Sequence, residues 1–266
     1  MHTVWKGSLS FGLVNIPVRM YTASRERELK FVLLHKKDLS QIRYARICKN
    51  EEKEVPWDEI VKGYEYQKGD FVILDDKDFE KVDVKKSKSI EIVNFIDEEE
   101  IDPIYFVKPY FLEPDKEAGN AYSLLRDAMK KSKKVALARY VIRNHEHLAA
   151  VKVHDNMLLL IEMRYCDELV QPEDLKIPTV KSENKQLEMA IKFIEQLTVP
   201  FVPEDYKDTY TEELKEVIEK KAKGKTIQPK SGEPKKTKVH DIMALLQASL
   251  EGTKKKPAPK SGKKSA

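Results

Sequence analysis

Two apolar stripes that meet at a glycine constrain the fold of this chain more than any other feature of its sequence. Residues 9–20 place apolar side chains at every second position, as an extended strand does, and the alternation changes phase beside Gly12. The apolar residues on the two successive faces are Leu9, Phe11 and Leu13, then Val14, Ile16, Val18 and Met20. This pattern predicts one bulged strand, whose bend suits closure of a sheet into a barrel. Pro17 restricts pairing at its own position, and an ordinary edge strand is the alternative.

Further segments with strand character follow, interrupted by one helical segment. The predicted strands cover residues 71–74, 89–96, 104–112, 135–143, 148–153 and 157–165. The polar residues 154–156 join the last two and have the length of a hairpin connection. Residues 118–131 instead repeat apolar side chains at the spacing of one helical face. The sequence therefore predicts a mainly β core with an inserted helix.

The pattern changes again after Pro178, where two helical stripes are predicted. They consist of Leu187, Ala190, Ile191, Ile194 and Leu197, and of Leu214, Val217 and Ile218. Thr209 and Glu212 have the spacing of a capping box at the start of the second helix, and Gly224 marks its end. From composition alone, these helices could equally pack on their own barrel.

Positive charge is concentrated at the C-terminal end of the chain. Residues 221–266 carry 13 lysines and 3 acidic residues, which leaves residues 1–220 with a net charge of −6. Such an arm attracts a polyanion, either nucleic acid or an acidic membrane surface. No apolar run is long enough to span a membrane, and the N-terminus lacks the apolar stretch of a signal peptide. With only two cysteines, the expected location is the reducing cytoplasm.

The last 42 residues divide into three parts by composition. Residues 225–238 are rich in Pro, Gly, Ser and Lys and predict a flexible linker. Residues 239–250 place Val239, Ile242, Met243, Leu246 and Leu250 at helical spacing, which predicts a short amphipathic docking helix; folding back on the core is the alternative. Residues 254–264 hold six lysines, beginning with Lys254, Lys255 and Lys256, and predict a disordered arm with salt-sensitive affinity for phosphates.

Two groups of basic residues inside the core are candidates for contact with DNA. The first group is Lys36, Lys37, Arg43 and Arg46, and the second is Lys130, Lys131, Lys133, Lys134, Arg139 and Arg143. In the strand predicted from residue 135, Arg139 and Arg143 share a face and could follow successive phosphates. Solvated surface charge is the alternative for any one of these residues.

Sequence motifs for catalysis are absent. The chain has no GxxxxGK[ST] phosphate loop, no GxSxG elbow and no HExxH pair. His145, Glu146, His147 and His154, and the acidic run at residues 97–100, are weak candidates for a metal site. We therefore expect no enzyme activity, no metal and no cofactor.

Four blocks of sequence resemble bacterial Ku proteins. They are WKGSLSFGLVNIPVRMYTA at 5–23, EVPWDEIVKGYEY at 54–66, EEIDPIYFVKPYFLEPDK at 99–116 and VALARYVIRNHEHLAAVKV at 135–153. The resemblance implies a homodimeric ring that threads onto DNA double-strand ends without reading bases and acts in non-homologous end joining. It also implies a barrel core at 1–180, a dimerising helical arm at 181–224 and a C-terminal extension at 225–266. Some family members have a motif like Cys-x-x-Cys at this point, whereas Cys48 of this chain is followed by Lys49, Asn50 and Glu51. No zinc is therefore expected there.

The same resemblance implies a partner for the C-terminal extension. Family members engage an ATP-dependent repair ligase through this region, and Ile242, Met243, Leu246 and Leu250 are the expected anchors. Two rival hypotheses remain for the whole chain. One is a nucleoid-type DNA-coating protein without preference for ends, and the other is a metal-dependent nuclease or hydrolase.

Overall fold

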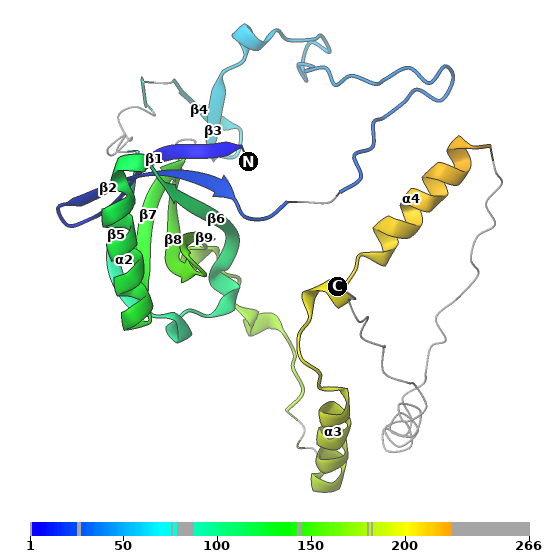
Figure 1. The fold of residues 1–266 in the computed structure, drawn as a ribbon. Coiled ribbons are helices and arrows are strands. Elements are labelled where there is room, and N and C mark those ends of the chain that lie inside the picture. The colour runs from blue at the N-terminus through cyan, green and yellow to red at the C-terminus, as the bar shows by residue number, and fades with distance from the viewer. Residues whose placement is uncertain are drawn as a thin grey trace. The chain divides into compact units, whose positions relative to one another are not determined.

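The structure is a computed structural model, which describes residues 2–25, 28–75, 77–78, 88–142, 145–179, 181 and 183–224 (Figure 1). The predicted linker, the predicted helix at 239–250, the tail lysines and Arg143 lie outside these residues. The chain divides into two compact units, and the second begins at Glu173.

Seven strands of the first unit form a closed barrel in the order β1-β2-β6-β9-β8-β7-β5. They are β1 (Thr3–Phe11), β2 (Val14–Thr22), β5 (Ser89–Asp97), β6 (Phe106–Pro114), β7 (Lys134–Ile142), β8 (His145–His154) and β9 (Met157–Met163). Neighbouring strands are antiparallel except β1 and β5, whose parallel pairing of residues 8–10 with 89–91 closes the ring. The mainly β core predicted from sequence is confirmed.

The prediction of one bulged strand at residues 9–20 is wrong. The change of phase at Gly12 marks a turn between two strands, and Phe11 pairs with Val14 across it. Gly12 has a φ of 55°, the left-handed conformation that a tight hairpin requires. Leu13 therefore lies fully exposed in the turn, whereas Leu9 before it and Ile16 after it are completely buried.

Helix α2 (Gly119–Ser132) is the helix predicted from residues 118–131, and it contributes to the barrel core. Its buried residues Tyr122, Leu125 and Met129 belong to the same cluster as Leu9 of β1 and Leu160 of β9. The Tyr122 hydroxyl donates to the Leu112 carbonyl and accepts from the Leu158 amide, both at 2.7 Å, so α2 is fixed to β6 and β9. Burial raises the pKa of Tyr122, which keeps its hydroxyl protonated.

A two-stranded hairpin of β3 (Lys62–Gln67) and β4 (Asp70–Leu74) is separate from the barrel sheet. The described residues also contain seven short 3-10 turns. They are η1 (Trp57–Glu59), η2 (Glu98–Glu100), η3 (Pro103–Tyr105), η4 (Lys116–Ala118), η5 (Cys166–Glu168), η6 (Pro172–Asp174) and η7 (Pro203–Asp205).

The second unit contains α3 (Asn184–Leu197) and α4 (Thr209–Ala222), the two helices predicted from the later stripes. The predicted capping box is wrong by one residue, because Asp208 is the N-cap and its carboxylate accepts from the Thr211 amide at 3.0 Å. Gly224 ends α4 as predicted, with a φ of 69° and a hydrogen bond from its amide to the Lys221 carbonyl. None of the helices in the described part of the chain is long and apolar enough to cross a membrane.

Candidate nucleic-acid interface

Lys36 and Lys37 of the first basic group occupy the turn of a small ribbon. The His35 amide donates to the Ser40 carbonyl at 2.8 Å, and the Ile42 amide donates to the Leu33 carbonyl at 2.9 Å. Inside the turn, Asp38 accepts hydrogen bonds from the amide and hydroxyl of Ser40, which lower the pKa of its carboxyl. The ribbon thus holds two exposed ammonium groups at its tip.

Arg46 begins a second ribbon on the same segment. Its carbonyl accepts from the Val55 amide at 2.8 Å, and its guanidinium lies 4.8 Å from the centre of the Trp57 ring. Trp57 is 71% exposed, so this cation–π contact is worth about 0.5–1 kcal/mol and leaves the guanidinium available to a phosphate. Arg43, between the two ribbons, is exposed. Lys49 and Lys53 also lie within the second ribbon, but they stand among Glu51, Glu52 and Glu54, so no cluster of basic residues marks them in the sequence.

The second basic group surrounds a hollow at the end of α2. Lys130, Lys133 and Lys134 line a space of about 340 Å³, together with Lys152 of β8. Lys133 ends the helix in a left-handed conformation, with a φ of 55°, and Lys131 is exposed outside this lining. Lys152 was missed by the sequence analysis because it stands alone in its strand.

Carboxylates already neutralise part of this second group. The Lys134 ammonium lies 2.7 Å from Asp97, and the Lys152 ammonium pairs with Glu98. Lys130, Lys131 and Lys133 are therefore the better candidates for binding a phosphate. Asp97 and Glu98 of the acidic run thus serve here as ion-pair partners.

Arg139 projects outward from β7, as the sequence predicts. It is exposed, whereas its neighbours Ala138 and Tyr140 are buried in the barrel. The outer face of this strand is not bare, because Val135 and Leu137 belong to a second apolar cluster with Ile101. The two basic groups lie on separate elements, one between β2 and β3 and the other on α2 and β7.

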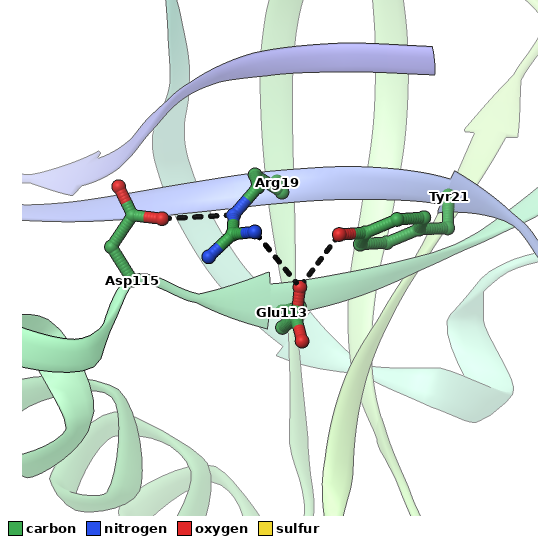
Figure 2. Close-up of polar contacts among 4 residues, drawn as sticks. All are labelled: Arg19, Tyr21, Glu113 and Asp115. Carbon is green, nitrogen blue, oxygen red and sulfur yellow. Dashed lines mark hydrogen bonds and ion pairs between the residues drawn. The ribbon is translucent and has the colours of Figure 1, made fainter. Parts of the chain in front are cut away.

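An ion-pair network occupies the outer face of β2 and β6 (Figure 2). Arg19 Nε donates to Asp115 Oδ1 at 2.9 Å, and a terminal guanidinium nitrogen of Arg19 lies 3.8 Å from Glu113. The Tyr21 hydroxyl donates to the same Glu113 oxygen at 2.7 Å. Hydrogen bonding to Asp115 is the main cause that raises the pKa of Arg19. Arg19 is the one cation among these four residues, and two carboxylates already hold it. None of the four is therefore a candidate for binding a phosphate.

The histidines proposed as weak metal ligands have separate partners. His147 Nδ1 lies 3.2 Å from Glu162, whereas His154 is 3.6 Å from Asp155 and stacks on Phe111. His145 and His154 are the ends of a ten-residue strand, which separates them by about 30 Å. The described residues hold no group of three or more His, Cys, Asp or Glu side chains suited to a metal ion.

Comparison with known proteins identifies the family of the barrel. Residues 10–189 match the family model of the Ku70/Ku80 β-barrel domain, which covers more than half of the chain. The chain belongs to the Ku family. Its recognition from the four sequence blocks is confirmed.

Curated relatives of this Ku-family chain align over nearly its whole length, and each carries the name "Non-homologous end joining protein Ku". The protein of Opitutus terrae is 46% identical over 97% of this chain and 96% of its own length. Those of Bacillus subtilis and Archaeoglobus fulgidus are each 40% identical over 96% of this chain, covering 83% and 100% of their own lengths. Among solved structures, the SPOC domain of human PHD-finger protein 3 aligns with a TM-score of 0.30 at 13% identity, covering 61% of this chain and 97% of that one.

Proposed function

We propose that this chain is a non-enzymatic DNA-end-binding protein of non-homologous end joining. The observation that carries the proposal is its membership of the Ku family, together with near-complete alignment to relatives named for that process. The lack of sequence motifs for catalysis agrees with a binding role. It would act at the bacterial nucleoid in the cytoplasm and needs no cofactor.

The proposed contact with DNA is made to the sugar-phosphate backbone. The exposed side chains assigned to it are Lys36, Lys37, Arg43, Arg46, Lys130, Lys131, Lys133 and Arg139, with Lys134 contributing less because Asp97 holds its ammonium. Arg143 and the tail lysines Lys254, Lys255 and Lys256 are proposed from sequence alone. Such contacts depend on salt and carry no base information, as a protein that accepts any broken end requires.

Two copies of the chain are proposed to form the DNA-binding ring. The apolar stripe of α3 supports this assembly, because Leu187, Ile191, Ile194 and Leu197 are 45–64% exposed in the single chain. Aromatic side chains are also exposed outside the stripe. They include Phe201, whose ring centre lies 5.5 Å from that of Tyr206, and Phe31 on the segment before β3. A second copy related by a two-fold axis would cover such surfaces.

Residues 239–250 are proposed to recruit the ATP-dependent repair ligase. Ile242, Met243, Leu246 and Leu250 would insert into a groove of that partner, as amphipathic helices commonly do. A second candidate function is DNA coating without preference for ends. The net charge of +10 over residues 221–266 favours it, because a basic arm binds phosphates along any DNA.

A comparison of linear and covalently closed DNA tests the proposal. In a gel-shift titration with one sequence in both forms, a threading ring binds linear fragments and leaves minicircles free. Cutting the minicircle once provides the control, because it restores an end without changing sequence or length. Equal binding of both forms would overturn the end-binding proposal and support DNA coating.

A further inference from the structure

The hollow at the end of α2 contains carboxylates among its lysines. Four elements meet there, namely the last turn of α2, the start of β7, the end of β8 and the 3-10 turn η2. Its charged lining consists of Lys130, Lys133, Lys134, Lys152, Glu98 and Asp155. Asp155 lies 3.6 Å from His154. Glu98 and the neighbouring Asp97 pair instead with lysines, so carboxylates of the protein itself occupy part of a surface proposed to bind DNA.

Strand pairing sets the positions of both carboxylates. Asp97 and Lys134 are cross-strand partners at the end of the β5–β7 ladder, and their charged atoms lie 2.7 Å apart. Glu98 follows as the first residue of η2 and pairs with Lys152 of β8, the strand on the other side of β7. The barrel fold itself therefore places one carboxylate at each of these two lysines.

Both ion pairs are open to exchange with a phosphate. The side chains of Asp97 and Glu98 are 54% and 50% exposed, and the side chain of Lys134 is 41% exposed. Exposed pairs of this kind are weak, and salt screens them further. A phosphate oxygen accepts the same charge-assisted hydrogen bonds from an ammonium group as a carboxylate oxygen does. A DNA phosphate at this hollow can therefore replace either carboxylate.

We propose that Asp97 and Glu98 compete with DNA phosphates for Lys134 and Lys152, and so lower the affinity of this hollow for the duplex. This inference rests on the DNA-binding role proposed above. A phosphate that pairs with either lysine leaves a carboxylate without its partner, close to a second negative charge. The exchange therefore adds little to the affinity, most of which comes at this hollow from Lys130 and Lys133 of α2.

Low affinity at this hollow suits the proposed threading ring. A closed ring is retained on DNA by encirclement, so strong ion pairs with the backbone would mainly slow its movement along the duplex. Each step along the backbone breaks contacts between ammonium groups and phosphates. The carboxylates of Asp97 and Glu98 can hold Lys134 and Lys152 during that step, which lowers the free-energy barrier between successive positions.

Fluorescence anisotropy with a labelled linear duplex tests the competition in the full-length protein. The Asp97→Asn, Glu98→Gln variant should bind about threefold to tenfold more tightly than the native protein near physiological salt. Its salt slope should also steepen by about 2, because Lys134 and Lys152 each gain a phosphate. The matched control, Glu99→Gln with Glu100→Gln, removes the same charge from the same exposed turn and should change the affinity by less than about twofold. Native affinity in the first variant, or an equal gain in both, would overturn the proposal.

Substitution of the two lysines assigns the gain to these ion pairs. Lys134→Gln with Lys152→Gln should change the affinity of the native protein little, because carboxylates already hold both ammonium groups. In the Asp97→Asn, Glu98→Gln background the same change should abolish the whole gain.

Melting temperatures separate this proposal from a purely structural role of the ion pairs. A structural role predicts less stable variants, whether carboxylates or lysines are replaced, without any gain in affinity for DNA, and that result would overturn the competition. A native protein that does not bind the duplex would contradict the proposed function itself. Native binding without the gain would contradict the competition alone.

Discussion

Tyr140 and His147 lie opposite each other across β7 and β8, with ring centres 5.2 Å apart. Both side chains meet Glu162 of β9, the hydroxyl of Tyr140 at 3.4 Å and the Nδ1 atom of His147 at 3.2 Å. Tyr110 of β6 also donates to Glu162 at 3.3 Å. One carboxylate thus joins four adjacent strands of the barrel.

This arrangement predicts an alkaline loss of stability through Tyr140. Burial, supported by the charge of Glu162, raises the pKa of Tyr140 far above its ordinary value. The unfolded chain releases this proton near pH ~10 while the folded chain retains it, so the stabilisation is complete below that pH and is lost as pH rises above it. Melting temperatures of Tyr140→Phe should therefore fall less steeply than those of the native protein from about pH 9.5 to 11. Tyr44→Phe, at an 87% exposed site, should follow the native curve.

The N-cap of α4 predicts an acid-sensitive helix. Hydrogen bonds from Thr211 lower the pKa of Asp208, so its contribution is present above the ordinary carboxyl pKa and is lost as pH falls through the folded value. Asp208→Ala should reduce helical circular dichroism at neutral pH. Asp208→Asn should keep the N-cap hydrogen bond, because asparagine also caps helices. Helicity in this variant should then no longer fall at low pH through protonation of residue 208. Equal helicity in Asp208→Ala and the native protein would show that the cap is not needed.

Charge reversal at the tip of the first ribbon should weaken DNA binding without changing sequence preference. The Lys36→Glu, Lys37→Glu variant removes two proposed phosphate contacts, which should lower the salt slope of binding by about 2. Fluorescence anisotropy at several salt concentrations measures this slope. Lys116→Glu, outside both basic groups, is the matched control. An unchanged slope would remove the ribbon from the interface.

Substitutions in the α3 stripe should dissociate the proposed dimer. Ile191→Asp with Ile194→Asp places two charges on a face that a second copy would bury, so sedimentation should report a monomer with weakened end binding. Lys192→Asp changes the charge of the same helix outside the stripe and should remain dimeric. A double variant that stays dimeric would place the interface elsewhere.

Removal of residues 225–266 should separate the two proposed interactions. The truncated chain should retain the dimer and its binding to DNA ends, whereas stimulation of the ligase should fall. Ligation assays and sedimentation on one preparation measure both properties. A truncated chain that is monomeric would contradict the division of roles.

The sequence predicts most of the barrel because its strands alternate with a clear period of two. The first hairpin was missed because a change of phase at Gly12 fits a bulge and a tight turn equally, and only pairing distinguishes them. Strand β3 was also missed, since both faces of Lys62–Gln67 are exposed and leave no apolar alternation. In the candidate interface, charge runs located Lys130 and Lys133. Charge runs did not identify Lys152, nor the ion pair between Lys134 and Asp97. Both features arise only when folding brings separate strands together.

The parallel pairing of β1 with β5 also has a consequence for synthesis of the protein. Ser10 and Ser89, whose hydroxyl oxygens lie 2.7 Å apart, are separated by 79 positions in the chain. Until the ribosome has delivered that later strand, the N-terminal hairpin keeps an open hydrogen-bonding edge that can pair with other nascent chains. The other edge of that hairpin, on β2, stays open until residues 110–114 of β6 follow, so only the completed barrel covers both edges.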